Sequence, residues 1–571
     1  MRTNGRLILA LFTLAALALL PLNPVFANAT ITIVNVDGPG EGFNDPGPAD
    51  PASTAGGNPG TTIGAQRLYA FQFAANIWGQ LLDSKVPIFV QASFDPLTCT
   101  ATSATLGAAG AIQVFANFPN APVANTWYHV ALANKLAGVD LAPAPTDPDS
   151  DDIVAFFNSN LNGNPACLGG RGWYYGLDAN EGTNIDLIAV LLHEFAHGLG
   201  FSNFVNEASG SNLGPPFLTD IYSTFTLDTS NGLHWNVMSN AQRQASAINV
   251  NRVVWDGGTV TAAVPSFLAF GTPGLTIDSP PAISGVYRVG AASFGPTLVA
   301  PGVTGNIILG NDGVGPATDG CEPFTNAAAV NNNIALVDRG GACGFTVKAA
   351  QAQAAGAKAV IIANNVAGGA PGMGGVDPTI IIPAVSVSLA DGNAIKAQLG
   401  IGVHGNVGVN MSVRAGADPN GFALLNAPNP VQLGSSISHW DPIASPNLLM
   451  EPAINANLTH TGDMTLAQFR DIGWYPDADL DMVPDDQDAC LGSDLAPTVV
   501  IDGCDSGVAN PLSADGCTIS DHIAQCAAGA GNHGGFVSCV THYTNTLKKN
   551  GTISGADKGA IQTCASGASI P

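Results

Sequence analysis

The stretch "LLHEFAHGLGFSN", residues 191–203, decides how the whole chain is interpreted. It follows the apolar run "NIDLIAVL" (184–191), and together they predict a buried helix. Because His193 and His197 are four residues apart, both imidazoles project from one face of that helix, about one turn apart. This spacing suits two ligands of one zinc ion at about 2.0–2.1 Å. Glu194 is placed to reach a water on such a metal and to act as a general base.

Gly200 follows seven residues after His193 and allows the positive φ that turns a chain sharply out of a helix. The pattern is similar to the HExxHxxG motif of metzincin metallopeptidases, in which a third histidine follows three residues later. That position is Asn203, whose neutral amide is a poor zinc ligand. Three other side chains offer the missing ligand: Glu207 in a Gly-rich segment, His234 in "GLHWNVM", and His439 in "GSSISHWDPIASPNLLMEP".

The third of these segments carries a resemblance. "HEFAHGLGFS", followed much later by "SHWD" and "NLLMEP", resembles leishmanolysin, a metzincin whose third histidine also arrives late. The resemblance implies that His193, His197 and His439 are zinc ligands, that Glu194 is the base and that Met450 is the methionine of the Met-turn. "MTLAQFRDIGW" (464–474) is similar to the segment after the Met-turn in such enzymes. The chain departs from the family in the long insertion between Gly200 and His439.

Much of this insertion has a pattern of its own. "IALVDRGGACGFTVKAAQAQAAGAKAVIIANN" (334–365) predicts strand, loop, helix and strand, and "IIIPAVSVSLADGNAIKAQL" (380–399) predicts strand and helix. The pattern resembles the protease-associated (PA) domain, which implies accessory binding rather than catalysis. We place this domain at residues 275–415, inserted into the peptidase domain.

An aspartate cluster follows in "DADLDMVPDDQDAC" (477–490). Hard carboxylate oxygens at alternating positions of a tight loop suit Ca²⁺. The spacing resembles a thrombospondin type 3 repeat, although Met482 stands where that repeat usually has Gly; an acidic linker is the alternative. The predicted calcium ligands are Asp477, Asp479, Asp481, Asp485 and Asp488.

Ten cysteines fall in even numbers in each expected domain, which predicts disulfides within domains and an oxidising compartment. Cys99 is expected to pair with Cys167, and Cys321 with Cys343, while the pairing of the last six stays open. Those six and three histidines of the tail also allow a zinc cluster, but export favours disulfides. The histidines are His522, His533 and His542.

The remaining segments complete an α+β organisation. Residues 1–29 resemble a secretory signal, with an apolar core and Ala27-Asn28-Ala29 as the cleavage site, so we expect a secreted protein without membrane insertion after cleavage. The peptidase domain is predicted at 30–274 and 416–476, the calcium loop at 477–490, and a Cys-rich helical module at 491–571. Residues 30–65 are expected to be loop-like. Further expected elements are helices over 67–82, 126–138, 519–530, 535–549 and 555–566, and strands over 86–94 and 151–161.

The net charge of −25, from 43 acidic and 18 basic residues, argues against nucleic acid or an anionic membrane as partner. Two functions remain. The first is a secreted zinc endopeptidase that acts on protein or peptide substrates. The second is a non-catalytic adhesin or binding protein on a degenerate metallopeptidase fold. Glu194 favours the enzyme, because a purely structural zinc site has no need of a base. The sequence leaves the oligomeric state open.

Overall fold

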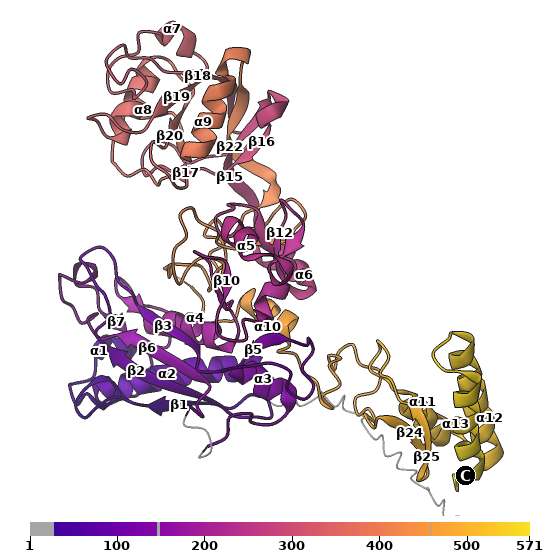
Figure 1. Ribbon diagram of the computed structural model, residues 1–571. Helices are drawn as coiled ribbons and strands as arrows, with labels where there is room; N and C mark the ends of the chain where they lie inside the picture. Colours follow the sequence, from indigo (N-terminus) through magenta and orange to yellow (C-terminus); the bar gives the residue numbers. More distant parts are fainter. Residues whose placement is uncertain (1–27, 145–148, 457, 571) are drawn as a thin grey trace, which may run out of the picture.

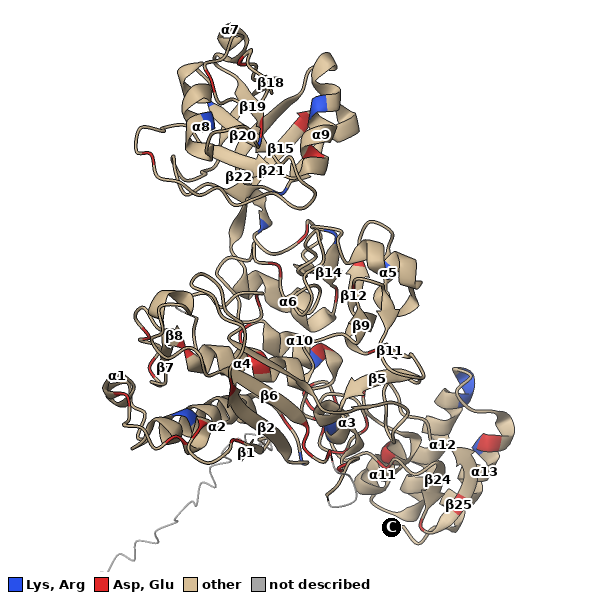
Figure 2. Ribbon diagram, turned by 60° about the vertical axis from the view of Figure 1, so that its left-hand side comes forward, with Lys and Arg blue, Asp and Glu red and all other residues tan. Residues whose placement is uncertain are grey.

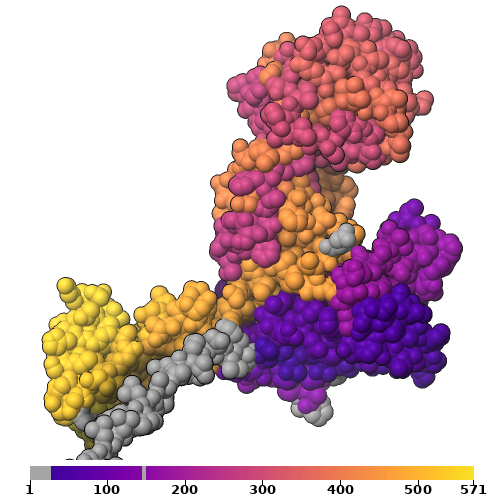
Figure 3. Space-filling view, turned by 180° about the vertical axis from the view of Figure 1, so that it is seen from behind, coloured from indigo at the N-terminus to yellow at the C-terminus, as the bar shows by residue number. Residues whose placement is uncertain are grey.

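The computed structural model describes residues 28–144, 149–456 and 458–570 of the chain. It mixes α and β structure in three bodies: a large lower body, the predicted PA domain above it and a small C-terminal module at its side (Figures 1 and 3). The predicted signal segment, apart from its last two residues, lies outside the described residues. Among the described helices, none combines the length and apolar character needed to cross a membrane.

The lower body is built on a four-stranded sheet with the order β1-β2-β6-β3. Strands β1 (Ile31–Asn35), β2 (Ile88–Asp95) and β6 (Ile153–Asn158) are parallel, and β3 (Gly107–Ala111) is an antiparallel edge strand. Helices α2 (Ile63–Leu81) and α4 (Leu187–Leu199) contact each other and pack on this sheet. The rings of Phe71, Phe157 and Phe195 meet between the helices and the sheet, so α4 is held firmly from its sheet side.

Two expectations for this body are wrong. The segment 30–65 is not loop throughout, because "ITIVN" pairs with β2 as β1, and Asp50 caps the short helix α1 (Pro51–Ala55). The segment 126–138 is a strand followed by a helix, since its first residues pair with two neighbouring strands. The elements involved, with the remaining short ones, are β4 (Val114–Phe115), β5 (Thr126–His129), α3 (Val130–Ala137), β7 (Trp173–Tyr174) and β8 (Ile185–Asp186).

Beyond α4 the chain forms a second layer that is completed only after the PA domain. The sheet β13-β12-β14-β23 takes its last strand, β23 (Ala423–Leu424), from the returning chain. Helix α10 (Thr465–Ile472), also from the returning chain, packs against α6. Buried residues from 29–268 and 417–474 form one hydrophobic cluster, so the insertion leaves the lower body with a single core. The other elements are β9 (Val205–Asn206), β10 (Ser211–Asn212), β11 (Thr219–Asp220), β12 (Thr226–Asp228), β13 (Leu233–His234), α5 (Asn240–Ser246), β14 (Val253–Trp255) and α6 (Gly258–Phe267).

The PA domain is an eight-stranded sheet with the order β16-β15-β22-β18-β19-β20-β21-β17. Strands β15 and β22 form a long antiparallel pair that joins the domain to the lower body (Figure 1). Separate apolar clusters lie on the two faces of the sheet, one of them including α8 residues and the other including Ile395 of α9. The strand–helix–strand and strand–helix predictions for 334–365 and 380–399 are confirmed. The elements are β15 (Phe270–Ser279), β16 (Gly285–Tyr287), β17 (Gly290–Ala291), β18 (Val303–Leu309), α7 (Ala327–Val330), β19 (Ile334–Asp338), α8 (Phe345–Ala354), β20 (Ala359–Ala363), β21 (Ala384–Val387), α9 (Leu389–Gln398) and β22 (His404–Arg414).

The C-terminal module has its own apolar core and contains a hairpin that the sequence pattern did not predict. The turn at Asp502-Gly503 joins two short strands, and three helices follow as expected. The elements are β24 (Thr498–Ile501), β25 (Cys504–Ala509), α11 (Ile519–Gly529), α12 (His533–Lys549) and α13 (Gly555–Gly567).

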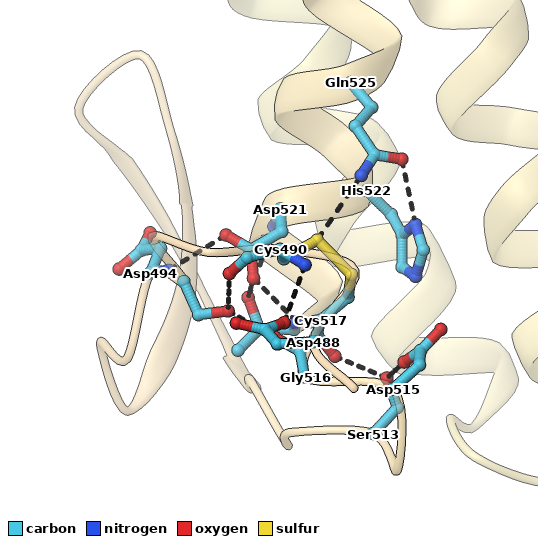
Figure 4. The surroundings of a disulfide bond; sticks show 12 residues. Asp488, Cys490, Asp494, Ser513, Asp515, Gly516, Cys517, Asp521, His522 and Gln525 are labelled. Atoms are coloured by element: carbon cyan, nitrogen blue, oxygen red, sulfur yellow. Dashed lines mark hydrogen bonds between the residues drawn. A yellow bond between two sulfur atoms is a disulfide. The ribbon is translucent and has the colours of Figure 1, made fainter. Parts of the chain in front are cut away.

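All ten cysteines are paired, so the prediction of disulfides over a zinc cluster in the tail is confirmed. Cys99–Cys167 and Cys321–Cys343 form as expected. Figure 4 shows the Cys490–Cys517 bond, which ties the end of the aspartate loop to the residue before the N-cap of α11. The remaining bonds are Cys504–Cys564 and Cys526–Cys539.

Charged residues are sparse along the ribbon of Figure 2. The acidic residues are spread over all three bodies. This distribution fits a protein whose net charge of −25 repels polyanions.

Candidate metal centre

Helix α4 is defined at both ends by specific contacts. The carboxylate of Asp186 caps its N-terminus by accepting the N–H groups of Ile188 and Ala189, and it also contacts Nε2 of His460 at 2.6 Å. Gly200 ends the helix with a φ of 136°. A Cβ there would lie 2.5 Å from Cδ1 of Ile472, so the turn requires glycine for its conformation and for the close approach of α10.

The fold brings together His193, His197 and His439. The Nε2 atom of His193 lies 3.3 Å from Nε2 of His197 and 3.2 Å from Nε2 of His439. All three side chains are buried. Four ligands arranged tetrahedrally at about 2.0–2.1 Å from a zinc ion lie about 3.3 Å from one another. The spacing of the nitrogens therefore fits zinc.

The protons of these rings point away from the point where they meet. Each Nδ1 atom donates a hydrogen bond of 2.8–2.9 Å to a backbone carbonyl oxygen. The carbonyls belong to Leu449, Phe201 and Ser435, for His193, His197 and His439 respectively. A carbonyl oxygen only accepts, so each neutral ring carries its proton on Nδ1 and a lone pair on Nε2. Three lone pairs converge without a proton among them, which is the arrangement that a cation stabilises.

Burial keeps these rings neutral. It lowers the pKa of His193 to about 3 and that of His197 to about 4, and it lowers the pKa of His439 well below its usual value. Near pH 7 all three are uncharged, as metal ligands must be.

The segment around Met450, the residue predicted to belong to a Met-turn, holds His193 in place. Its carbonyl at Leu449 accepts the Nδ1 proton of His193, and the carboxylate of Glu451 accepts the N–H of Leu448 at 2.7 Å. Met450 is fully buried, and its carbonyl accepts the N–H of Trp440, the residue after His439. The turn thus links the segments that carry two of the three histidines.

Glu194 is buried beside the histidines and faces the edge strand β3. Its carboxylate accepts a hydrogen bond from the backbone of Ala109. Burial raises its pKa to about 8, against the effect of that hydrogen bond. A divalent cation next to it would favour the carboxylate form.

The edge strand β3 presents backbone groups beside Glu194 that do not pair with another strand among the described residues. Hydrogen-bonded pairs alternate along an antiparallel ladder, and the bonds from Ile112 N–H to Asp152 and from Asn158 N–H to Leu106 set the alternation here. The backbone groups of Gly107, Ala109 and Ala111 therefore point away from β6. That side of β3 pairs with no strand among the described residues.

Asn203, at the position of the third histidine in the short metzincin motif, has a different task. Its backbone N–H and its Nδ2 both donate to the hydroxyl of Ser438, at 3.2 and 3.1 Å. It therefore fastens the turn after α4 to the residue that precedes His439. No pattern in the sequence indicated this role.

The other two candidate ligands lie elsewhere. Glu207 contacts the side chain of Asn203 at 3.2 Å, and burial raises its pKa. His234 pairs with Asp256 at 2.7 Å. Neither belongs to the group of converging histidines.

The aspartate loop is only partly assembled around one point. Asp477, Asp479 and Asp481 bring carboxylate oxygens within 4.8 Å of one another, and Asp477 and Asp481 are buried. Asp485 and Asp488 are not in this group, and each accepts a backbone N–H, at 2.8 and 2.7 Å.

Two oxygens of this loop have no hydrogen-bond partner. Among the described residues, Oδ2 of Asp481 and Oδ2 of Asp488 are buried acceptors without a donor. An unsatisfied buried carboxylate oxygen is costly, and a cation is one way to satisfy it. Met482 takes a φ of 74°, the left-handed conformation that the Gly of such loops usually provides.

A PA-domain family model matches residues 303–395, so a PA domain is present in the insertion, as predicted. No curated protein matches the chain. Among solved structures, a zinc aminopeptidase from Bacillus subtilis is 25% identical, with a TM-score of 0.19, over 26% of this chain and 36% of that one. An aminopeptidase from Aneurinibacillus sp. strain AM-1 is 22% identical, with a TM-score of 0.18, over 27% and 37%. A peptidase M28 precursor from Shewanella amazonensis SB2B is 17% identical, with a TM-score of 0.18, over 30% and 42%.

The chain thus spans less than half the length of each of these structures. Similarity of this extent carries no argument about the activity, which has to be argued from the metal centre itself.

Proposed function

We propose that the chain is a secreted zinc-dependent endopeptidase with a leishmanolysin-like, metzincin type of metal centre. The observation that carries the proposal is the convergence of three neutral imidazoles, with Nε2 of His193 about one tetrahedral edge from Nε2 of His197 and of His439. Three protein ligands leave a fourth position open, which is typical of catalytic rather than structural zinc.

Zinc bound there would supply a Lewis acid that polarises a carbonyl and lowers the pKa of a water. Glu194 is the residue of this chain that can move the proton. Its carboxylate takes a proton from the attacking water and returns it to the leaving amine. The Ala109 N–H orients that carboxylate, and the surrounding core limits access of bulk water to it.

The free edge of β3 supports cleavage within a chain rather than at its end. An extended peptide can add to this edge as a further strand, held by the backbone groups of Gly107 and Ala111 and by the carbonyl of Ala109, whose N–H is bonded to Glu194. The small side chains of "GAAGA" leave the edge accessible to many sequences. Such binding uses the backbone of the substrate on both sides of the scissile bond and needs no free terminus.

We further propose that the aspartate loop binds Ca²⁺ through Asp477, Asp479 and Asp481, with Asp488 completing the site by its unpartnered Oδ2. Asp485 accepts the N–H of Ala478, so its hydrogen bond stabilises the loop itself. The site would stiffen the connection between the lower body and the C-terminal module.

The test of the enzymatic proposal is cleavage of denatured casein by purified protein loaded with one equivalent of zinc. Mass spectrometry of the products should show new termini inside the casein chains, and a substrate with a blocked N-terminus should be cut equally well. Release of single residues from the N-terminus would show an aminopeptidase instead. Zinc binding without any cleavage would favour the non-catalytic binding protein.

A further inference from the structure

Among the described residues, the PA domain also contacts the lower body through Arg288 and Gly369, away from the strand pair β15–β22 and the residues that flank it. The guanidinium of Arg288, just before β17, pairs with the carboxylate of Asp441. The N–H of Gly369 donates to the carbonyl of Asn429 at 2.8 Å. Asn429 and Asp441 lie on either side of His439, so the PA domain holds the segment that carries the third histidine at both of its ends.

Asp441 is tied closely to the metal centre. It lies two residues after His439, and its side chain is 1% exposed. Its N–H donates to the carbonyl of Leu424, and its Oδ1 accepts the N–H of Ile443. Its Oδ2 is left for Arg288, whose side chain is 25% exposed. Removing the arginine would leave a buried carboxylate without its counter-charge, a strongly destabilising change.

The opposite end of the segment is held by close backbone approach. Gly368 has a φ of 126°, and a Cβ there would lie 3.0 Å from the carbonyl oxygen of Asn429. Within the segment, the carbonyl of Ser435 accepts the Nδ1 proton of His439, and the carbonyl of His439 accepts the N–H of Asn426. A shift of either end would therefore be passed on to the imidazole through short, directional contacts.

We propose that Arg288 is a positioning residue of the metal centre, through which the PA domain fixes the segment that carries His439. The inference rests on the proposed function, because it assigns His439 to that centre. Its consequence is that the PA domain controls how firmly the centre holds its metal. A partner that competes for Arg288 would loosen the third ligand without touching the histidines.

The test compares Arg288→Met with a matched control, Lys396→Met. Lys396 is 27% exposed and pairs with Asp338, 25% exposed, inside the PA domain at 2.8 Å, so its loss removes an ion pair of the same domain without leaving a buried charge and without a contact to the lower body. Hydrogen exchange of metal-free full-length protein is followed at the amides of Trp440 and Asp441, which are bonded to Met450 and Leu424. In parallel, transfer of zinc from loaded protein to a chelator is timed.

Arg288→Met is expected to speed exchange at these two amides at least tenfold and to speed zinc transfer by about 10–100-fold, the effect usual for loss of a supporting contact. Lys396→Met should change neither. Arg288→Lys should restore part of both effects, since it keeps the charge but not the fork geometry. If Arg288→Met unfolded the PA domain, amides in β19 and β20 would exchange fast. In that case Asp441→Asn, which removes the carboxylate charge that pairs with Arg288, is measured in place of Arg288→Met.

Exchange and zinc transfer that match wild type in Arg288→Met would overturn the inference. The exchange result does not depend on metal or on cleavage. If the wild-type protein cleaves nothing, the enzymatic proposal fails, while fast exchange at Trp440 and Asp441 still supports the link between the PA domain and the His439 segment.

Discussion

Replacement of His439 by alanine is the sharpest test of the metal centre. It removes one of three converging nitrogens and leaves His193 and His197 as a pair on one helix. Loss of an outer contact of a metal ligand already weakens affinity about 10–100-fold, so loss of a ligand should cost at least about 100-fold. At a zinc concentration about 1,000 times the wild-type Kd, bound zinc stabilises the folded protein by about 4.1 kcal/mol. A 100-fold weaker variant would keep only about 1.4 kcal/mol of this.

With an unfolding entropy of about 2.1 cal/mol/K per residue, the difference of about 2.7 kcal/mol corresponds to about 4 °C in Tm for a body of about 300 residues. Calorimetry should therefore show that the rise in Tm between chelator-treated and zinc-loaded samples shrinks by this amount in His439→Ala. Because each variant is compared with its own chelator-treated sample, the cost of the cavity left by the ring cancels.

His234→Ala is the matched control, since His234 pairs with Asp256 and lies outside the converging group. It should keep the full zinc-dependent rise in Tm and the cleavage of casein. If His439→Ala kept them as well, the assignment of the third ligand would be refuted. Loss of the rise in His234→Ala instead would move that role to His234.

Three further predictions concern single residues. Glu194→Gln should retain one zinc per chain by elemental analysis but lower the rate of casein cleavage by about 100–10,000-fold, because the general base is lost; an active variant would remove Glu194 from the mechanism. Met482→Gly should raise the free energy of unfolding in urea denaturation by up to about 1 kcal/mol, since relief of the left-handed φ is worth about 1–2 kcal/mol and the entropy of glycine in the unfolded chain costs about 0.5–1 kcal/mol; a less stable variant would contradict the loop geometry. Burial raises the pKa of Asp152 from 3.8 to about 7, so the folded state keeps a proton that the unfolded chain has lost, and stability should fall as the pH rises through this window. Urea denaturation of Asp152→Asn between pH 4 and about 7 should show a shallower fall than wild type, and an equal slope would show that Asp152 does not titrate as argued.

The helix that carries His193 and His197 could be predicted because the histidine spacing and the apolar pattern lie in one short stretch. Two histidines four residues apart define a face, and the apolar run before them defines a helix. The PA domain could be predicted for a similar reason, since its strands are continuous apolar runs separated by a helix and turns. The roles of residues far from this helix in the sequence, His439 and Met450, could be predicted only from the family resemblance.

The supporting contacts could not be predicted, because most of them are made by backbone. Three backbone carbonyls set the tautomers of the histidines, those of Leu449, Phe201 and Ser435. Because every residue has a backbone carbonyl, the sequence does not indicate which of them accepts a histidine proton. The edge strand β3 was missed because "GAAGA" has low strand propensity, and only its pairing with β6 makes it a strand. Strand β1 was missed because it is short and is followed by a segment rich in Gly and Pro.

Asn203 shows how a metal centre of this kind can depend on an inserted domain. In the short motif the turn after the helix would bring its own third ligand, and the centre would be complete within one segment. Here the same turn carries Asn203, which donates to the hydroxyl of Ser438. The turn therefore binds the segment that contains His439 and supplies no third histidine of its own. That segment reaches the turn only after the chain has passed through the PA domain, and Arg288 and Gly369 of that domain contact both of its ends. The PA domain therefore contacts the segment that brings His439 to the other two histidines. For this reason, a displacement of the PA domain should move His439 more than His193 or His197.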